Sequence, residues 1–313
     1  MTFKSTSHTV LDVNTLVLNT VTPFNIYIKK SKDYVIIIET GTLLTDKVLK
    51  QLSQQQTLYA KKDDSGEKRL TYETLSFYIE ANKNFPQKNI QFLYNVSTKL
   101  FSNMLTGEYS SINISCLESI TKSVLFLIKE NKNFLKDTIH YFSDDYILNV
   151  HSLHVAIYAM NLGNLLNFTD AKLLDLGVAG LLHDVGINKI DDNITHKNLE
   201  LDEEEYAIVK KHPQLSVEII EHHRIHNPYI IDGVLHHHER YDGSGYPDGL
   251  YDKQISDYAS ILAISDVFDA LTNNRPHRKK HTYFEALKLM MKDESMQNQF
   301  NNDYLKTFLK SLI

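Results

Sequence analysis

The spacing of hydrophobic and polar positions changes along the chain from a strand pattern to a helical pattern. Apolar runs at 24–28 and 34–38 flank a short polar segment, which predicts a hairpin, and residues 58–60 predict a returning strand. Between them, helical spacing predicts a short helix capped by Thr45 or Asp46. From about residue 70 onward the apolar positions recur at helical spacing. The pattern therefore predicts a small α+β domain followed by a mainly α region.

Three segments follow from this change of pattern. Residues 1–66 are predicted to be a small strand-containing accessory or regulatory domain, which ends in a charged, glycine-containing linker at 61–68. Residues 67–140 show helical periodicity without any chemically distinctive cluster, so we expect a helical connector or a dimer surface. Residues 141–313 contain the chemistry, and we expect them to form one helical domain.

Composition narrows the class of protein. The chain has 313 residues, of which 42% are hydrophobic, so it is long enough to bury a sizeable core. The formal net charge of -6 disfavours a binder of nucleic-acid polymers, which would carry a basic face. The single cysteine, Cys116, excludes a disulfide framework and suits a reducing cytoplasm. We see no signal peptide, and the longest apolar run, 34–38, predicts a buried strand rather than a membrane span.

Histidines are concentrated in the last half of the chain, where thirteen of the fifteen follow residue 150. The pair His183-Asp184 follows an apolar segment at 173–182. Burying an imidazole and a carboxylate there is costly unless they are paired or bind a metal. Downstream, the segment 236–247 places three histidines and a glutamate before a turn rich in glycine and ending in proline. Imidazoles at this density indicate metal binding, and the glycines allow the backbone to approach a ligand closely.

Several of these motifs occur together and in a characteristic order. They resemble the HD-GYP domain, a branch of the HD metal-dependent phosphohydrolases, over roughly residues 140–290. The resemblance implies a helical HD-type bundle with a metal centre, and an enzyme that hydrolyses cyclic di-GMP. The matching motifs are His151-Ser152, His183-Asp184, His212-Pro213, His237-His238-Glu239, Gly245-Tyr246-Pro247, Asp266 and Arg275-Pro276-His277-Arg278.

The resemblance implies seven metal ligands: His151, His183, Asp184, His212, His237, His238 and Asp266. Neighbouring side chains on a helix diverge by about 100°, so we expect His237 and His238 to serve different metals. Asp184 is expected to bridge two ions, because a carboxylate can bind two cations. Some family members bind a third metal through a glutamate where this chain has Ile147, so we predict two divalent metal ions. Imidazole and carboxylate ligands without cysteine are compatible with iron, manganese, zinc or nickel, and the resemblance favours iron, with manganese next.

The implied reaction opens cyclic di-GMP to linear pGpG or GMP. A hydroxide shared by metals about 3.5–4 Å apart would attack the phosphorus atom, with Asp184 as a catalytic metal ligand. The family positions that contact substrate phosphates fall on Arg275 and Arg278, for which capping of a helix end is the alternative interpretation. Tyr246 is expected to form part of the cleft wall that binds substrate, or of a surface that docks a protein partner.

One departure from the family pattern bears on turnover. Ile187 occupies the position of a family lysine that touches the scissile phosphate and protonates the leaving oxygen. Lys189, two residues later, either replaces that lysine as a catalytic residue or is an ordinary solvated side chain. The alternative to a phosphodiesterase is therefore a weak or inactive module that binds cyclic di-GMP or a signalling partner. A hydrolase of another cyclic dinucleotide and a homodimer are also left open.

Overall fold

The protein is described by a computed structural model that divides into two compact units. One unit contains residues 1–100 and 113–123, and the other contains residues 101–112 and 124–313. The division passes through α4 (Pro86–Thr106) and α5 (Ile114–Glu130). The predicted linker at 61–68 lies, except for Lys61, outside the described residues, which are 8–11, 16, 22, 25–31, 33–55, 57–61, 75, 79, 82, 86–106, 114–141, 148–195, 197, 201–273 and 280–312.

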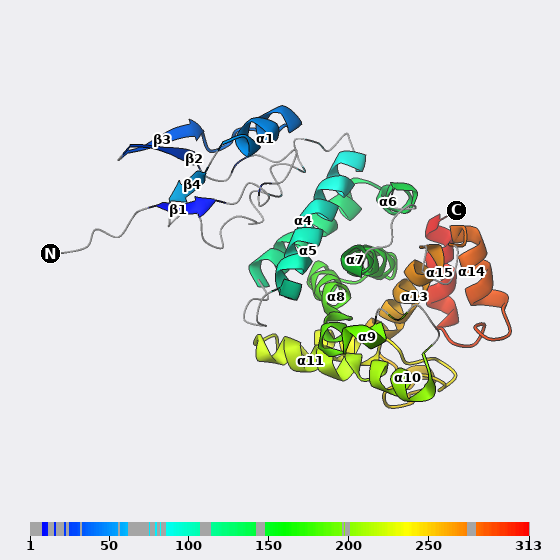
Figure 1. Cartoon of the computed structure of the whole chain (residues 1–313). Helices are drawn as coiled ribbons and strands as arrows, with labels where there is room; N and C mark the ends of the chain where they lie inside the picture. Colours follow the sequence, from blue (N-terminus) through cyan, green and yellow to red (C-terminus); the bar gives the residue numbers. More distant parts are fainter. Residues whose placement is uncertain are drawn as a thin grey trace. The chain divides into compact units, whose positions relative to one another are not determined.

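The first unit contains a four-stranded antiparallel sheet. Its strands lie in the order β1-β4-β2-β3 (Figure 1). The bounds are β1 (His8–Leu11), β2 (Ile26–Lys30), β3 (Asp33–Ile38) and β4 (Leu58–Lys61). The predicted hairpin is β2–β3, and β4 is the predicted returning strand. The sequence did not predict β1, because four residues are too few to display a strand period.

The helix predicted in this unit is α1 (Asp46–Ser53), and the structure identifies its cap. The Thr45 side-chain oxygen accepts a hydrogen bond from the backbone N–H of Val48 at 3.3 Å. Asp46 instead lies in the first turn and pairs with Lys50 at 3.0 Å. The apolar face of the helix packs against the hydrophobic core of this unit. That core is formed by Leu11, Ile26, Leu44, Leu52, Leu58 and Ala60.

The prediction of a buried strand at 34–38 is wrong in part. Strand β3 lies at the edge of the sheet, where Val35 and Ile36 are 40% and 45% exposed. A continuous apolar run is typical of a strand covered on both faces, and the sequence pattern does not reveal that this strand lies at the edge of the sheet.

The second unit is helical, as predicted for the region that contains the histidine motifs. Its central helices are α7, α8, α12 and α13; α7 packs against α8 and α13, and α12 packs against the same two helices (Figure 1). The elements are α6 (Phe134–Tyr141), α7 (Leu148–Leu165), α8 (Asp170–Leu182), η3 (Val185–Lys189), α9 (Asp192–Thr195), α10 (Glu203–Val209), α11 (His212–His222), α12 (Pro228–His236), η4 (Asp252–Gln254), α13 (Asp257–Thr272), α14 (Tyr283–Lys292) and α15 (Asn302–Leu312).

The close contact between α7 and α8 determines where the metal-binding motifs meet. Helix α7 is buried on all sides from residue 151 to 160, as expected for a helix in the centre of a bundle. A Cβ at Gly180 would lie 2.7 Å from the Cα of Ala156, so glycine at this position lets the two backbones approach. This approach brings His151 on α7 beside His183, which directly follows α8.

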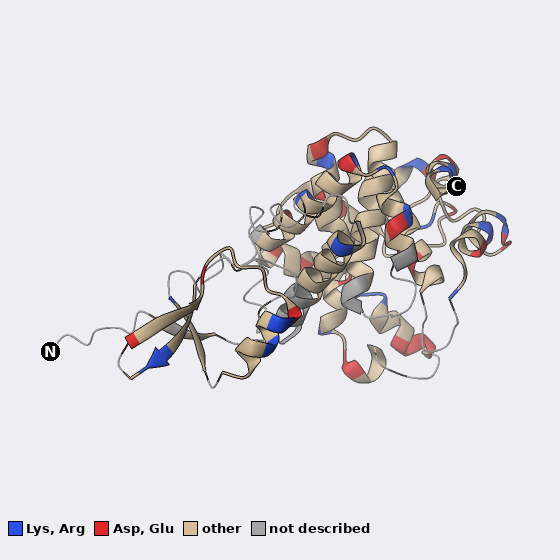
Figure 2. Ribbon diagram, turned by 90° about the horizontal axis from the view of Figure 1, so that it is seen from above, with Lys and Arg blue, Asp and Glu red and all other residues tan. Residues whose placement is uncertain are grey.

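Charged residues of both signs are interspersed along the described helices rather than separated into faces (Figure 2). None of the described helices combines the length and the apolar character needed to cross a membrane.

Candidate metal centre

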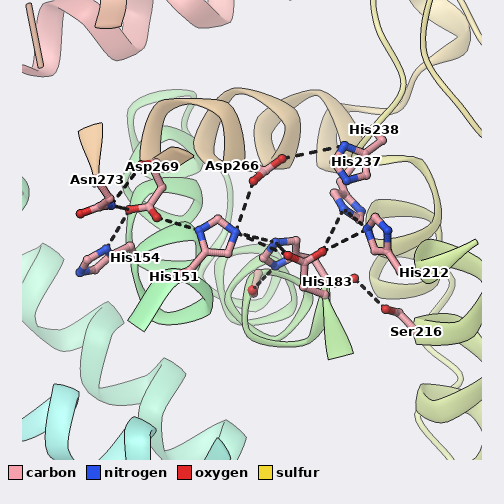
Figure 3. Close-up of polar contacts among 12 residues, drawn as sticks. His151, His154, His183, His212, Ser216, His237, His238, Asp266, Asp269 and Asn273 are labelled. Atoms are coloured by element: carbon pink, nitrogen blue, oxygen red, sulfur yellow. Dashed lines mark hydrogen bonds and ion pairs between the residues drawn. The ribbon is translucent and has the colours of Figure 1, made fainter. Parts of the chain in front are cut away.

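Five helices bring their histidine and aspartate side chains to one buried place in the second unit (Figure 3). The residues come from the start of α7, the end of α8, the start of α11, the segment after α12 and the middle of α13. All seven predicted ligands meet here, in two groups whose donor atoms lie within 4.8 Å of one another in each group.

The first ligand group contains His151, His183 and Asp266, and all three are buried. The Nε2 atoms of His151 and His183 face each other at 3.2 Å. Nε2 of His151 also lies 3.3 Å from Oδ1 of Asp266. Three potential donors from three different helices therefore converge on one point.

The second ligand group contains His212, His237, His238 and Asp184. The Nε2 atoms of His212 and His237 face each other at 3.3 Å, as in the first group. The ring of His238 lies 4.1 Å from that of His237, centroid to centroid. Nδ1 of His238 is 4.0 Å from Oδ2 of Asp266, so this ring lies on the side nearest the first group.

Asp184 lies between the two groups and turns one oxygen toward each. Its Oδ2 is 3.3 Å from Nε2 of His183 in the first group. Its Oδ1 is 3.1 Å from Nε2 of His212 in the second group. A carboxylate in this position offers one oxygen to each group, and its bridging of two cations stays a prediction.

The expectation that His237 and His238 serve different metals is wrong in its geometric premise. Both side chains belong to the second group, with their rings in contact. The argument from a divergence of about 100° assumes a regular helix. Helix α12 ends at His236, and His237 is its C-terminal cap, so His238 leaves the helix and its ring turns back toward its neighbour.

Hydrogen bonds to backbone carbonyl groups fix how three of the imidazoles face the centre. The Nδ1 atoms of His183, His212 and His237 lie 2.7–2.8 Å from the carbonyl oxygens of the residues three positions earlier. A carbonyl oxygen only accepts, so each Nδ1 carries the hydrogen and donates it. In the neutral ring Nε2 then holds a lone pair directed at the centre, as metal-binding histidines do.

Asp269 holds His151 from behind, and sequence reasoning assigned this residue no role. His151 Nδ1 donates to Oδ2 of Asp269 at 2.7 Å, and His154 Nδ1 lies 2.8 Å from Oδ1. Asn273 donates its Nδ2 hydrogen to the same Oδ1 at 2.7 Å. A sequence signal that could have identified this role is the spacing of Asp266 and Asp269, which lie three residues apart on an otherwise apolar helix. That spacing places both carboxylates on the same face toward α7.

The carboxylates of the centre are ionised because imidazoles surround them. Burial would by itself raise the pKa of Asp184, but the imidazoles around it, His183 foremost, hold that pKa well below its usual range. Burial also opposes ionisation of Asp266, yet His151 and its neighbours lower its pKa strongly. The pKa of Asp269 falls to about 2 against the effect of burial, through His154 and His151.

The imidazoles respond to the same environment in two ways. Burial lowers the pKa of His237 to about 4, and burial with the neighbouring His237 lowers that of His238. For His151 and His212 burial acts in the same direction, but nearby aspartates outweigh it and raise the pKa. Each pair of facing Nε2 atoms therefore contains one nitrogen that favours positive charge.

The residues present fit divalent metal ions. Two facing lone pairs at 3.2–3.3 Å repel each other unless a proton or a cation lies between or beside them. Ionised carboxylates and neutral imidazoles without cysteine are the donor set of first-row transition metals. The two groups, His151, His183 and Asp266 on one side and Asp184, His212, His237 and His238 on the other, would each hold one ion.

The loop that contains the Gly-Tyr-Pro motif is anchored beside the second group. The buried carboxylate of Glu239 accepts hydrogen bonds from the backbone N–H groups of Asp248 at 2.7 Å, Gly249 at 3.1 Å and Leu250 at 3.0 Å. A Cβ at Gly245 would lie 2.4 Å from the backbone nitrogen of Arg240, so this glycine lets the turn approach the chain's own backbone, and the predicted approach to a ligand stays a prediction. Glu239 therefore braces the loop and lies outside both ligand groups.

Tyr246 of this loop contacts the metal-ligand imidazoles directly. Its ring stacks on His238 with 4.7 Å between centroids and meets His212 edge-on at 6.5 Å. Burial raises the pKa of its hydroxyl, so the group stays protonated. The structure thus places Tyr246 beside the second group, and its binding of substrate stays a prediction.

Of the remaining predicted site residues, the structure describes Lys189, which does not belong to either ligand group. Nζ of Lys189 lies 3.9 Å from Oε2 of Glu218 on α11, in the half-exposed surroundings of an ordinary surface lysine. Arg275, Arg278 and Ile147 lie outside the described residues.

The comparisons with known proteins agree with this fold and site. The HD domain family matches residues 120–300, more than half of the chain. The chain belongs to this family, as an HD-GYP domain protein. The HDG"Y"P protein Bd1817 from Bdellovibrio bacteriovorus has the same fold, with a TM-score of 0.60, 21% identity, and coverage of 97% of this chain and 99% of that one.

Among curated proteins, cyclic di-GMP phosphodiesterase PA4108 of Pseudomonas aeruginosa is 33% identical over 196 residues, which cover 63% of this chain and 46% of that protein. The cyclic di-GMP phosphodiesterase response regulator RpfG of Xanthomonas campestris is 40% identical over 125 residues, 39% of this chain and 32% of that protein. The 3'3'-cGAMP-specific phosphodiesterase 2 of Vibrio cholerae is 37% identical over 133 residues, 42% of this chain and 26% of that protein. The chain therefore spans less than half the length of these relatives.

Proposed function

We propose that this chain is a metal-dependent phosphodiesterase that hydrolyses cyclic di-GMP to linear pGpG or GMP. The main support is the carboxylate of Asp184, which turns one oxygen to each of two groups of imidazoles. Relatives that share the HD region are named cyclic di-GMP phosphodiesterases, which favours turnover over an inactive binding module.

The proposed cofactors are two divalent metal ions, with iron favoured and manganese next. His151, His183 and Asp266 would hold one ion, and His212, His237 and His238 the other, with Asp184 shared between them. When bound, such a pair of ions lowers the pKa of water and neutralises charge on a phosphate. Imidazole and carboxylate donors without cysteine are compatible with iron, manganese, zinc or nickel, and the family resemblance favours iron.

Other residues of the chain hold the metal-binding side chains and the substrate in position. Asp269 and the carbonyl groups behind the imidazoles keep the donor atoms aimed at the centre before substrate arrives. Tyr246 forms one wall beside the second group. We also propose that Arg275 and Arg278 bind substrate phosphates, and that Lys189, once released from Glu218, is the residue able to reach the leaving oxygen in place of the family lysine.

A second substrate deserves the same test, because the Vibrio cholerae relative is named for 3'3'-cGAMP. Both compounds are cyclic dinucleotides with two phosphodiester bonds, and the ligand groups address the phosphate, which the two compounds share. Discrimination would depend on the residues that meet the bases. A panel of cyclic dinucleotides measures which one this chain prefers.

We also propose roles for the segments that surround the site. Residues 1–66 would act as an accessory or regulatory domain, 67–140 as a helical connector and 141–313 as the phosphohydrolase domain. The loop that contains Tyr246 would also serve as the docking surface for a protein partner, and the helical connector as the surface of a homodimer. We propose a cytoplasmic location, because the single cysteine, Cys116, allows no disulfide framework within the chain and suits a reducing compartment.

The decisive experiment uses protein purified without oxygen, loaded with iron or manganese, and checked for metal content. Incubation with cyclic di-GMP should give pGpG or GMP by chromatography. The absence of both products from a protein with two bound metals would reject the proposal. Replacing Ile187→Lys should raise the rate about tenfold or more if a family-like general acid is restored, while Ile187→Met, which changes the side chain without adding charge, should not.

A further inference from the structure

Lys210 lies between two aromatic rings next to the metal centre. It caps the C-terminal end of α10, two residues before His212. Its Nζ lies 4.7 Å from the centroid of the Tyr206 ring and 5.4 Å from that of Tyr246. An ammonium group over two tyrosine faces is attracted to both and is held in place.

Tyr246 connects this cation to the ligands. The ring that Lys210 approaches is the ring that stacks on His238 at 4.7 Å. The ammonium group is thus one aromatic ring away from the second ligand group, at its rim and not inside it. A negative group of a substrate whose reacting phosphate occupies the metals would reach this rim.

Among the described residues, no carboxylate oxygen lies within 4.0 Å of Nζ of Lys210. No described carboxylate therefore neutralises the charge of this lysine. Other lysines nearby differ in this respect. Lys197 bonds to Glu205 at 2.6 Å, and Lys189 lies 3.9 Å from Glu218. Aromatic rings hold a cation without cancelling its charge, so Lys210 keeps its capacity to bind an anion.

The ring partners of Lys210 are also partly open. Tyr206 is 47% exposed, so one of the two rings is accessible from solution. Exposed aromatic faces bind nucleobases by stacking, and a cation beside them binds the phosphate of the same nucleotide. The combination of Tyr206, Lys210 and Tyr246 therefore has the chemistry of a nucleotide subsite.

We propose that Lys210 is a specificity-determining residue that binds the second phosphodiester of a cyclic dinucleotide while the first occupies the metal centre. This inference rests on the proposed function, because only a substrate with two phosphates needs a cation at the rim. A cyclic dinucleotide carries two negative charges on opposite sides of its ring. The ligand groups account for one of them, and Lys210 is placed to receive the other.

The test compares Lys210→Met with its neighbour Lys211→Met. Lys211 is exposed and adjacent, so its loss changes the net charge equally without touching the rings. Binding of cyclic di-GMP to metal-loaded protein is measured by calorimetry, and turnover of bis(p-nitrophenyl) phosphate, a diester with one phosphate, is measured in parallel. Lys210→Met should weaken cyclic di-GMP binding about tenfold or more, and leave turnover of the small diester within about twofold. Lys211→Met should change neither, and Lys210→Arg should restore part of the binding.

Two results would overturn the inference. One is cyclic di-GMP binding by Lys210→Met that equals the wild type, and the other is an equal loss on both ligands, which would place Lys210 at the reacting phosphate or in folding. Failure of the proposed function is recognised separately, as wild-type protein that binds cyclic di-GMP without hydrolysing it. In that case the comparison of the lysine variants still shows whether Lys210 contacts the second phosphodiester. If the wild-type protein does not bind cyclic di-GMP at all, the proposed contact is rejected together with the proposed function.

Discussion

The two ligand groups differ in what holds their imidazoles. In the first group, His183 is held by the backbone carbonyl oxygen of Gly180, but His151 is held by a side chain, the carboxylate of Asp269. In the second group, His212 and His237 are held by backbone carbonyl oxygens of Val209 and Val234. A side-chain anchor supplies negative charge and is open to substitution, whereas a backbone anchor persists as long as its helix does. The first group is therefore the one whose geometry a single distant residue controls.

The groups also differ in what surrounds them. The first is enclosed by α7, α8 and α13 and all three of its residues are buried, whereas Asp184 and His238 of the second are partly exposed. The second borders the loop that contains Tyr246, with Lys210 beyond it. The enclosed group is suited to retaining an ion, and the bordered group is suited to meeting a substrate. Substitutions that act on one group, on both, or on the link between them test this division.

The largest effect is expected from Asp184→Asn, because this carboxylate faces both groups. Loss of its charge should lower the metal content of both groups and reduce cyclic di-GMP hydrolysis by about three orders of magnitude. Metal analysis and product chromatography on the same sample measure the two effects. Asp303→Asn, on the exposed surface of α15, removes the same charge and should leave both unchanged. Retention of one full equivalent of metal by Asp184→Asn would show that the carboxylate is not shared.

Asp269→Asn should damage the first group and spare the second. The oxygen atoms of Asp269 face donors on both sides, His151 on one and His154 with Asn273 on the other. An amide must therefore turn its NH2 group against a donor, and the anchor of His151 also loses its charge. Residues behind metal-binding histidines typically contribute about 10- to 100-fold to metal affinity or activity.

The measurement for Asp269→Asn is a metal titration that resolves two binding steps, of which one should weaken and the other remain. His154→Asn is the matched control, since it keeps a donor near the position of Nδ1 and leaves the contact between Asp269 and His151 in place. It should change metal affinity by less than about threefold. Equal weakening of both steps by Asp269→Asn would contradict the independence of the two groups.

The set of candidate ligands could be predicted from the sequence, but the residues that hold those ligands in place could not. Histidine and aspartate at the motif positions identify metal chemistry by residue type alone, and the structure brings all seven together. Their assignment as ligands stays a prediction. Asp269 was missed because an acidic residue three positions after another has several explanations until α7 is placed beside α13. His237 and His238 were separated wrongly because the end of α12 was not visible in the pattern. The edge position of β3 and the rings around Lys210 likewise depend on contacts between distant segments.

Glu239→Gln should act on the second group through its loop. Glu239 accepts three backbone N–H groups with its two oxygens, and an amide would place its NH2 against at least one of them. We expect the free energy of unfolding to fall by about 2 kcal/mol and the amides of residues 248–250 to exchange faster with solvent. Hydrogen exchange followed by mass spectrometry measures both. Glu221→Gln, exposed on α11, should leave exchange in the loop unchanged, and slow exchange in Glu239→Gln would show that other contacts hold the loop.

The smallest effect is expected from Ser216→Ala, which tests the link between the groups. The Ser216 hydroxyl accepts the backbone N–H of Gly186 at 2.8 Å and donates to the carbonyl oxygen of His183 at 2.8 Å, and so ties the end of α8 to α11. Its loss leaves a buried N–H without an acceptor, which should lower the free energy of unfolding by about 1 kcal/mol and activity by less than about twofold. Ser265→Ala removes a buried hydroxyl that bonds only the carbonyl of Ile261 within its own helix, so it should cost less. The free energy of unfolding of both variants is measured with denaturant. Equal losses would show that Ser216 contributes no more than an ordinary buried serine, and that the helices alone keep the spacing of the two groups.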